Sequence, residues 1–249
     1  MRRELGLKIL KIGGSVITEK RRDVLDSART DRIKEICEVI ARNPDDLILI
    51  HGAGSFGHPY VERYRLEERR DIFGISVTHL ACKRLNEMIC KTLSDYGVAV
   101  LPIHPLLFFK RDIELKCDLE FLKSIVDEGF LPVLHGDMVY NSKERRFEVL
   151  SGDEITVFLA EKLDVERIGF ATDVDGIIYN GKVLDVFDKS MLNSVGFASG
   201  KSDVTGGMRG KLERIFNSKI RCEVFVFKGS AENVEKFLRG EEIGTKVIV

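Results

Sequence analysis

The stretch LKILKIGGS, residues 7–15, decides the fold class. It is an apolar run of strand length that ends directly in two glycines, and DLILIHGAGSFGH, residues 46–58, repeats the arrangement. Short apolar runs bounded by glycine are typical of buried strands, and the apolar spacing of residues 28–40 is that of a helix. A strand, a helix and a second strand in this order predict two parallel strands in a buried sheet.

The same alternation continues along the chain. Further strands are expected at 98–103, 130–134, 167–171, 223–228 and 246–249, and helices at 76–94, 119–127, 153–163 and 208–218, with a short helix before the last strand. The charged residues 61–71 are expected to form a connection, and alternating residues at 138–150 and 177–184 predict two antiparallel hairpins. We therefore expect the α/β class, with an open, mainly parallel sheet sandwiched by helices and with β-hairpin excursions. No linker interrupts the pattern, so one domain is expected over 1–249, with two lobes of about 1–150 and 151–249.

The composition argues against several classes of protein. The 249 residues include 39 Lys and Arg against 40 Asp and Glu, a net charge of -1, so no global basic field attracts nucleic acid or an anionic membrane. The apolar run 98–109 is short and contains two prolines, and no membrane span is expected. The N-terminus meets charge and glycine too soon for a signal peptide, which favours a cytoplasmic protein. Five cysteines without a C-x-x-C pair favour buried apolar residues over disulfides or zinc.

Ligands of open parallel sheets bind beyond the carboxyl ends of the strands, so the residues that follow each strand are the candidates. After the first strand, Gly13-Gly14 lets backbone N–H groups approach a phosphate, Lys11 adds a charge, and Lys20 follows nearby. A simple tight turn with solvated lysines would explain the same residues equally well. The second strand is followed by G-x-G-x-x-G at 52–57, but Pro59 and a charged stretch come next and no acidic residue ends the following strand, so NAD binding is set aside.

His58 is the candidate anion ligand among the histidines, because it ends this glycine-rich segment. For His79, His104 and His135 a structural role is expected, since none shows metal-type spacing. Three further segments could each offer backbone N–H groups or charge: Ser151-Gly152-Asp153-Glu154, residues 172–176 and residues 205–211. The first is expected to open a helix with Ser151 as its N-cap. A Walker A motif is absent, because only three residues separate the glycines at 196 and 200.

Taken in order, K-I-G-G-S (11–15), G-A-G-S-F-G-H (52–58), S-G-D (151–153), T-D-V-D-G (172–176) and T-G-G-M-x-x-K (205–211) resemble the amino acid kinase superfamily over essentially the whole chain. The histidine that ends the second motif resembles the isopentenyl phosphate kinases, which convert isopentenyl phosphate to isopentenyl diphosphate with ATP in isoprenoid biosynthesis. Relatives that phosphorylate amino-acid carboxylates, carbamate or UMP lack this histidine.

The resemblance implies a role for each matching residue. The residues implied for ATP are Lys11, Ile12, Gly13, Gly14, Ser15, Gly54, Asp173, Val174, Asp175, Gly176, Gly207 and Lys211. Those implied for the acceptor are Ala53, Gly54, Gly57, His58 and Gly152, and the implied catalytic residues are Lys11, Lys20, His58 and, as the organiser of the lysines, Asp153. Ala53 stands where a third glycine is frequent. The resemblance further implies Mg²⁺, for which no protein ligand is identified, an N-terminal acceptor lobe, a C-terminal nucleotide lobe and a homodimer.

An apolar tail on the acceptor needs an apolar wall. We expect it on the helix after His58, where Phe73, Val77 and Leu80 have helical spacing together with Ala81 and Leu85, although ordinary core packing explains such a stripe as well. Two other functions stay open from the sequence. One is a kinase of the same fold with a phosphonate or carboxylate acceptor, and the other is a nucleotide-binding regulatory module without catalysis.

Overall fold

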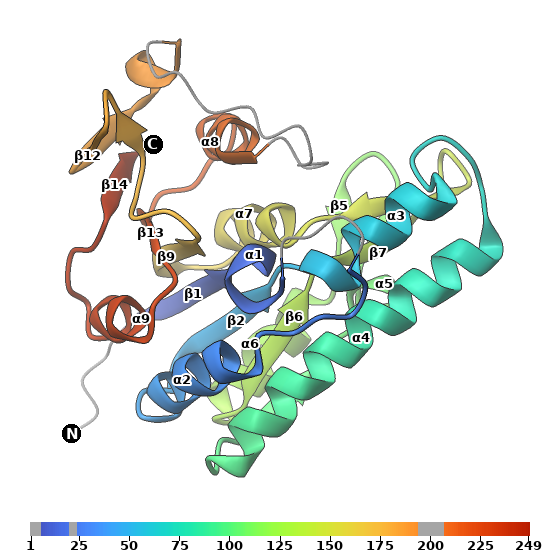
Figure 1. Ribbon diagram of the computed structural model, residues 1–249, viewed down its shortest axis with the longest axis horizontal. Coiled ribbons are helices and arrows are strands. Elements are labelled where there is room, and N and C mark those ends of the chain that lie inside the picture. The colour runs from blue at the N-terminus through green and yellow to red at the C-terminus, as the bar shows by residue number, and fades with distance from the viewer. Residues whose placement is uncertain (1–5, 20–23, 194–206) are drawn as a thin grey trace.

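The computed structural model describes residues 6–19, 24–193 and 207–249. In these ranges the chain forms an eight-stranded sheet in the order β12-β14-β13-β9-β1-β2-β6-β3 (Figure 1). The strands are β1 (Leu7–Ile12), β2 (Leu47–His51), β3 (Val100–Pro102), β6 (Leu131–His135), β9 (Val165–Thr172), β12 (Val186–Asp188), β13 (Glu223–Lys228) and β14 (Thr245–Ile248). All neighbours are parallel except β13 and β14. The mainly parallel sheet is therefore confirmed.

Helices cover both faces of this sheet (Figure 1). The helices are α1 (Gly14–Ile17), α2 (Thr30–Ala41), α3 (His58–Tyr64), α4 (Ile72–Asp95), α5 (Pro105–Phe108), α6 (Leu119–Asp127), α7 (Gly152–Lys162), α8 (Gly207–Phe216) and α9 (Ala231–Leu238). Alternate strand residues enter two apolar clusters, as the two-residue period of a strand requires. Ile9 of β1 packs with α6, α7 and α8, whereas Leu10 packs with α2, α4 and α9.

Two small sheets extend from this core, and each contains an antiparallel hairpin. One has the order β5-β4-β7-β8, made of β5 (Leu115–Lys116), β4 (Lys110–Arg111), β7 (Asp137–Asn141) and β8 (Arg146–Leu150). The other is the hairpin of β10 (Ile178–Tyr179) and β11 (Lys182–Val183), whose turn residues Asn180 and Gly181 both have positive φ, 48° and 77°. Both hairpin predictions are confirmed.

The segment after His58 differs from the prediction. Residues 58–64 form helix α3, and α4 begins at Ile72, where the Asp71 side chain accepts a hydrogen bond from Gly74 N at 2.8 Å. Pro59 lies in the first turn of α3, where no N–H donor is needed, so it starts a helix here instead of preventing one. The argument that no helix follows the glycine motif therefore fails. The argument that no acidic residue ends the next strand holds, because β3 ends in Pro102.

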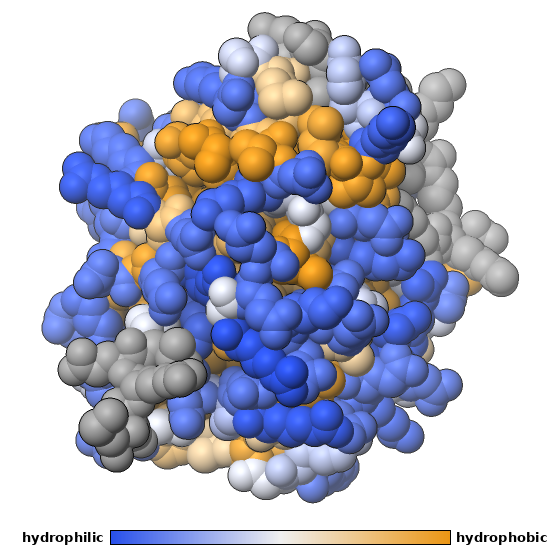
Figure 2. All heavy atoms as spheres, turned by 90° about the vertical axis from the view of Figure 1, so that its left-hand side faces the viewer, coloured by the Kyte–Doolittle hydropathy of each residue, from blue (hydrophilic) through white to orange (hydrophobic). Residues whose placement is uncertain are grey.

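The surface over β12 and β14 is partly apolar. Figure 2 shows this face of the molecule, with hydrophobic side chains gathered in its upper half. The exposed apolar residues of these strands and of the neighbouring hairpin are Ile178, Val183, Val186 and Ile248, together with Val249. None of the helices in the described ranges has the length and apolar character needed to cross a membrane.

Candidate active site

Four glycines close the carboxyl edge of the sheet. Each follows a strand and donates its N–H to the last carbonyls of a neighbouring strand: Gly13 to Ala171 O at 2.8 Å, Gly52 to Ile12 O at 2.8 Å, Gly136 to His51 O at 2.9 Å and Gly229 to Thr172 O at 2.7 Å. We call these four residues the glycine edge. They bring the ends of β1, β2, β6, β9 and β13 together, which is where an open parallel sheet binds its ligand.

Glycine is required at this edge because two backbone segments touch. A Cβ at Gly14 would lie 2.5 Å from Gly54 N, and a Cβ at Gly52 would lie 2.5 Å from Gly14 N. Side chains would therefore push apart the segments that follow β1 and β2. Gly13-Gly14 is consequently more than a tight turn, since it lets the first predicted phosphate loop lie directly against the second.

Lys11, Asp153 and Lys211 form an ionic cluster beside the glycine edge, which we call the lysine–aspartate bridge. Lys11 Nζ lies 2.7 Å from Asp153 Oδ1, and Lys211 Nζ lies 2.6 Å from Asp153 Oδ2. The three side chains come from β1, from the first turn of α7 and from α8, and each is at most 14% exposed. Burial would raise the pKa of Asp153, but the two lysines outweigh it and hold this pKa well below its usual range.

Helix α7 begins against this bridge. Ser151 caps it by accepting a hydrogen bond from Glu154 N at 3.1 Å, as the sequence predicts. A Cβ at Gly152 would lie 3.2 Å from His51 O and 3.4 Å from Lys11 Cε. The first N–H groups of α7, which have no partner within the helix, are therefore held next to the ends of β1 and β2.

Residues 53–58, which we call the histidine segment, run from the end of β2 to the first residue of α3. Ser55 N donates to Thr18 Oγ1 at 3.1 Å, and the Thr18 hydroxyl donates to Gly14 O at 2.8 Å. A Cβ at Gly57 would lie 3.4 Å from Cys82 Sγ. The segment is thus tied to the loop after β1 on one side and packs on α4 at Cys82 on the other. His58 itself is half-buried.

The face of α4 that contacts the histidine segment is a different face from the predicted one. Ala81 and Leu85 are fully buried, but Phe73 and Leu80 are 66% and 48% exposed. At about 100° per residue, both lie roughly 160–180° around the helix from Cys82. Phe73 lies beside Tyr64 of α3, with ring centroids 6.0 Å apart. An acceptor-tail wall formed by Phe73, Leu80 and the half-buried Val77 therefore stays a prediction.

The predicted nucleotide residues lie at the end of β9. Thr172 Oγ1 donates to Val174 O at 3.0 Å, and Asp175 pairs with Lys228 at 3.1 Å. Gly176 packs tightly, since a Cβ there would lie 2.6 Å from Thr245 Oγ1. Gly207 starts α8 with a positive φ of 59°. Lys20, Thr205 and Gly206 lie outside the described residues.

A buried polar group beneath the glycine edge was not identified as a unit from the sequence. His51, Asn86, His104 and His135 form it, and we call it the histidine network. His51 and His135 end β2 and β6, are fully buried, and their rings stack with centroids 5.6 Å apart. Each Nδ1 lies close to the carbonyl oxygen of the glycine that follows, at 3.1 Å for His51 and 3.0 Å for His135. The repeated His-Gly pair after the two strands is the signal that could have revealed it.

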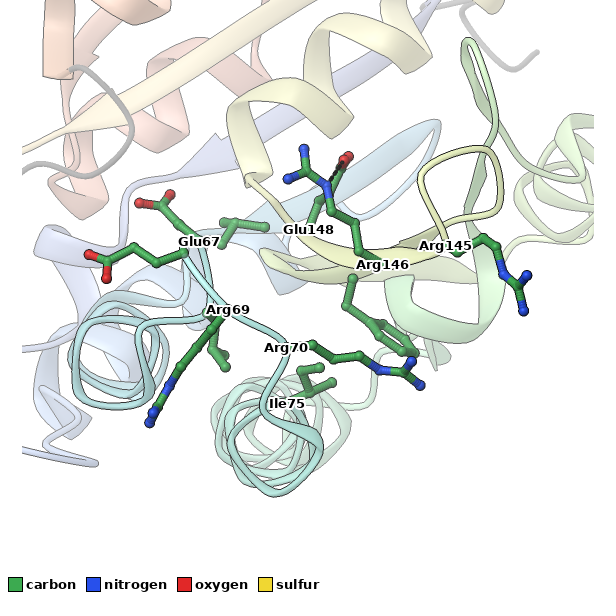
Figure 3. Close-up of a pocket in the computed structure, with 11 residues that line it drawn as sticks. Glu67, Arg69, Arg70, Ile75, Arg145, Arg146 and Glu148 are labelled. Atoms are coloured by element: carbon green, nitrogen blue, oxygen red, sulfur yellow. Dashed lines mark hydrogen bonds and ion pairs between the residues drawn. The ribbon is translucent and has the colours of Figure 1, made fainter.

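One cavity of the described residues lies away from the glycine edge. It has about 570 Å³ and lies between the α3–α4 connection and the β7–β8 turn. Figure 3 shows Arg146 directed toward Glu148, with Glu67 on one side and Arg145 on the other. It contains none of the predicted site residues. No group of three or more His, Cys, Asp or Glu able to hold a metal ion occurs in the described ranges.

Known proteins share both the sequence and the fold of this chain. The model of the amino acid kinase family matches residues 6–228. The isopentenyl phosphate kinase of Methanocaldococcus jannaschii is 35% identical over 97% of this chain and 98% of its own length. A solved isopentenyl phosphate kinase structure superposes with a TM-score of 0.82 and 29% identity, over 97% of this chain and all of the other. A substrate complex of an isopentenyl phosphate kinase gives a TM-score of 0.77 at 28% identity, over 98% and 100%.

Proposed function

We propose that this chain, which belongs to the amino acid kinase family, transfers the γ-phosphoryl group of ATP to isopentenyl phosphate and releases isopentenyl diphosphate and ADP. The observation that carries the proposal is the lysine–aspartate bridge at the glycine edge, directly beside the histidine segment. Two buried lysines on a single carboxylate leave a net positive charge where the backbones of both predicted phosphate loops meet. Such a site suits a reaction between two phosphate groups.

The nucleotide would lie across the loop after β1 and the segment after β9. Gly13, Gly14 and Ser15 would offer N–H groups to its phosphates, and Lys11, Lys211 and Lys20 would neutralise the transferring group. Asp153 would set the positions of Lys11 and Lys211 without touching the nucleotide. Residues 173–176 with Gly207 would hold the rest of the nucleotide.

The acceptor would lie on the histidine segment. The backbones of Ala53 and Gly54 and the first turn of α7 at Gly152 would donate to its phosphate, and Gly57 would allow the His58 side chain to reach it. A phosphate monoester has its second pKa at about 6, so it is already an anionic nucleophile near neutral pH and needs no strong general base. One of its oxygens would form the new bond to the γ-phosphorus, while the bond from that phosphorus to the β-phosphate oxygen breaks.

Mg²⁺ would be bound mainly by ATP. The described residues contain no cluster of carboxylate or histidine ligands, and Asp153 is already shared by two lysines. Bound together with ATP, Mg²⁺ would supply positive charge against the negative charge of the phosphates. This chain's own contribution is to hold the triphosphate at the glycine edge.

We infer a homodimer through α4, supported by the exposed apolar residues of that helix. Ile72, Phe73 and Leu80 are 70%, 66% and 48% exposed, which is unusual for neighbouring large apolar side chains on one helix. Light scattering of Phe73→Glu beside the unmodified chain tests this, and a monomer in both would contradict it. The cytoplasmic location expected from the sequence is still a prediction.

ADP release with a panel of acceptors tests the proposed activity. We expect release with isopentenyl phosphate and ATP, a diphosphate product in the phosphorus NMR spectrum, and only background release with a carboxylate, carbamate, UMP or a phosphonate. Lys20→Ala and Lys11→Ala should each remove most turnover while the chain stays folded. Release with a carboxylate alone, or none with any acceptor, would contradict the proposal.

A further inference from the structure

Two backbone N–H groups lie close together beside Gly136. A Cβ at Gly136 would lie 3.3 Å from Gly152 N, 3.5 Å from Ala53 N and 3.7 Å from Leu150 O, so glycine lets these segments pack closely. Gly152 is the first residue of α7, and its N–H has no partner within the helix. Within the described ranges, Ala53 N donates to no protein oxygen either. Both N–H groups can therefore donate to an anionic group bound at the glycine edge.

The orientation of Ala53 N–H depends on the peptide it shares with Gly52. In a trans peptide the C=O and the N–H point in opposite directions. The preceding peptide shows this, because His51 O accepts from Gly136 N at 2.9 Å toward β6 while Gly52 N donates to Ile12 O at 2.8 Å toward β1. Whatever holds Gly52 O therefore also directs Ala53 N–H.

The ring of His51 holds Gly52 O. Nδ1 lies 3.1 Å from this oxygen, and since a carbonyl oxygen only accepts, Nδ1 must carry the proton. On the other side of the ring, Nε2 lies 3.2 Å from Asn86 Nδ2, which only donates. Nε2 must therefore be unprotonated, and the two contacts select a single tautomer.

Asn86 can select the tautomer because its own amide cannot turn over. Asn86 Nδ2 also donates to Val133 O at 3.2 Å, and its Oδ1 accepts from Cys90 Sγ at 3.5 Å. A flipped amide would place two oxygens against each other. Burial, as the main cause, lowers the pKa of His51 to about 4, so the ring is neutral near neutral pH, as the tautomer requires.

We propose that His51 is a positioning residue, kept in its Nδ1–H tautomer by Asn86, which directs the Ala53 N–H at the phosphate of the acceptor. The identity of that acceptor rests on the proposed function. His51 would not touch the substrate, because its ring is fully buried below the glycine edge. It would act through a single peptide group.

His135 provides a matched comparison inside the same chain. It is equally buried, and its Nδ1 lies 3.0 Å from Gly136 O. The residue after Gly136, however, is Asp137 of β7, whose backbone is held by pairing with Leu150 of β8. Ala53 is followed by a short 3-10 turn, residues 54–56, without such pairing. Loss of the ring should therefore disturb the backbone after Gly52 more than the backbone after Gly136.

Nitrogen NMR of the histidine rings in the unmodified protein tests the tautomer without any substrate. We expect the His51 signals of a neutral ring with a protonated Nδ1 and a bare Nε2. A ring with a protonated Nε2 and a bare Nδ1 would overturn the inference. This measurement needs no variant, so a folding defect cannot obscure it.

Steady-state kinetics then test the positioning. For His51→Phe we expect the KM for isopentenyl phosphate to rise about tenfold, as for the loss of one hydrogen bond to an anion, with the KM for ATP within about twofold. His135→Phe should change both values by less than about twofold. Equal rises in both KM values, or equal effects of the two variants, would overturn the inference.

Asn86→Leu is the second variant, because it leaves the His51 ring in place. We expect a mixture of both tautomers in the spectrum and a smaller rise in the acceptor KM, and an unchanged tautomer would overturn the role of Asn86. If the unmodified chain shows no turnover with isopentenyl phosphate, the proposed function fails on its own. Turnover together with the wrong tautomer contradicts only this inference.

Discussion

The lysine–aspartate bridge and the histidine network lie at the same edge of the sheet but hold their residues in different ways. The bridge joins full charges at 2.6 and 2.7 Å, whereas the network joins neutral rings and an amide at 3.0 to 3.2 Å. Charged groups interact over longer distances, and a buried charge needs a counter-charge. Neutral hydrogen bonds fix the orientation of the groups that they join and the position of the proton on each ring. The comparison teaches that two kinds of interaction divide the work at this edge of the sheet. Charged groups supply strong electrostatic interactions, and neutral donors and acceptors set the orientation of backbone groups.

Asp153→Asn should have the largest effect, because it leaves two buried lysines without a counter-charge. We expect kcat with isopentenyl phosphate to fall about a thousandfold, since loss of charge positioning acts in the transition state. The matched control is Glu154→Gln on the same turn, whose partners Arg111 and Arg214 are only partly buried. A kcat of Asp153→Asn within tenfold of the unmodified chain would break the distinction between the two regions.

The next effect concerns His58, the last residue of the histidine segment. His58→Ala should lower kcat/KM for isopentenyl phosphate about a hundredfold, because a donor to the acceptor phosphate is lost. His58→Gln keeps a donor without charge and should retain part of the activity. If Gln and Ala are equally poor, charge decides at this position, and it belongs with the bridge. If Ala is nearly as active as the unmodified chain, His58 has no part in the reaction.

Acid should destabilise the two regions at different pH. Burial lowers the pKa of His51 to about 4 and of His135 to about 3, from an ordinary 6.5. Above pH 6.5 their contribution is complete. Below it the unfolded chain binds protons first, so the free energy of unfolding falls by about 1.4 kcal/mol per pH unit for each ring until its folded pKa is reached. The low pKa of Asp153 in the folded chain contributes stability above its ordinary value of 3.8, and this contribution is lost only as the pH falls below that value.

Urea unfolding at pH 6, 5 and 4 checks this separation. For His135→Phe we expect the slope between pH 6 and 4 to be shallower by about 1.4 kcal/mol per pH unit than in the unmodified chain, because one proton fewer is taken up on unfolding. Asp153→Asn should leave that slope unchanged. If His135→Phe and the unmodified chain have the same slope, His135 of the histidine network does not contribute to the loss of stability in acid.

The smallest effect is expected at Lys228. Its pair with Asp175 lies at the same edge but is 54% and 63% exposed, so solvent screens it. Lys228→Ala should change the free energy of unfolding by less than about 0.5 kcal/mol and the KM for ATP by less than about twofold. A larger change in the KM would mean that Lys228 contacts the nucleotide. Solvent exposure would then not distinguish the ion pairs of this edge that affect activity from those that do not.

The sequence predicts the sheet well because burial and glycine carry the signal. Residues 47–50 are apolar on both faces, as in a strand covered by helices, and the glycine that closes the edge follows this strand at residue 52. Ser151 was predicted as a cap for the same kind of local reason. These features need only neighbours in the chain.

The errors arise where distant packing decides. Helix α3 was missed because Pro59 and the charged residues after it favour a connection, yet Val61 is buried against α4 residues such as Ile75. On α4, periodicity shows two apolar strips, and only the sheet determines that Ala81 faces inward and Leu80 outward. The histidine network was missed as a unit because Asn86 and His51 are 35 residues apart, and their contact follows from the fold.

Strand β1 has a consequence for how the chain is made. It pairs with β2, residues 47–51, on one side and with β9, residues 165–172, on the other. A nascent chain can therefore pair β1 with β2 early, but its second edge stays open until residue 172 has been added. At about 5–20 residues per second, the intervening stretch takes on the order of ten seconds to synthesise. Because Gly13 N closes on Ala171 O and Gly229 N closes on Thr172 O, the glycine edge is complete only when residue 229 has been added. Until β9 is made, the open side of β1 is the surface a chaperone would meet.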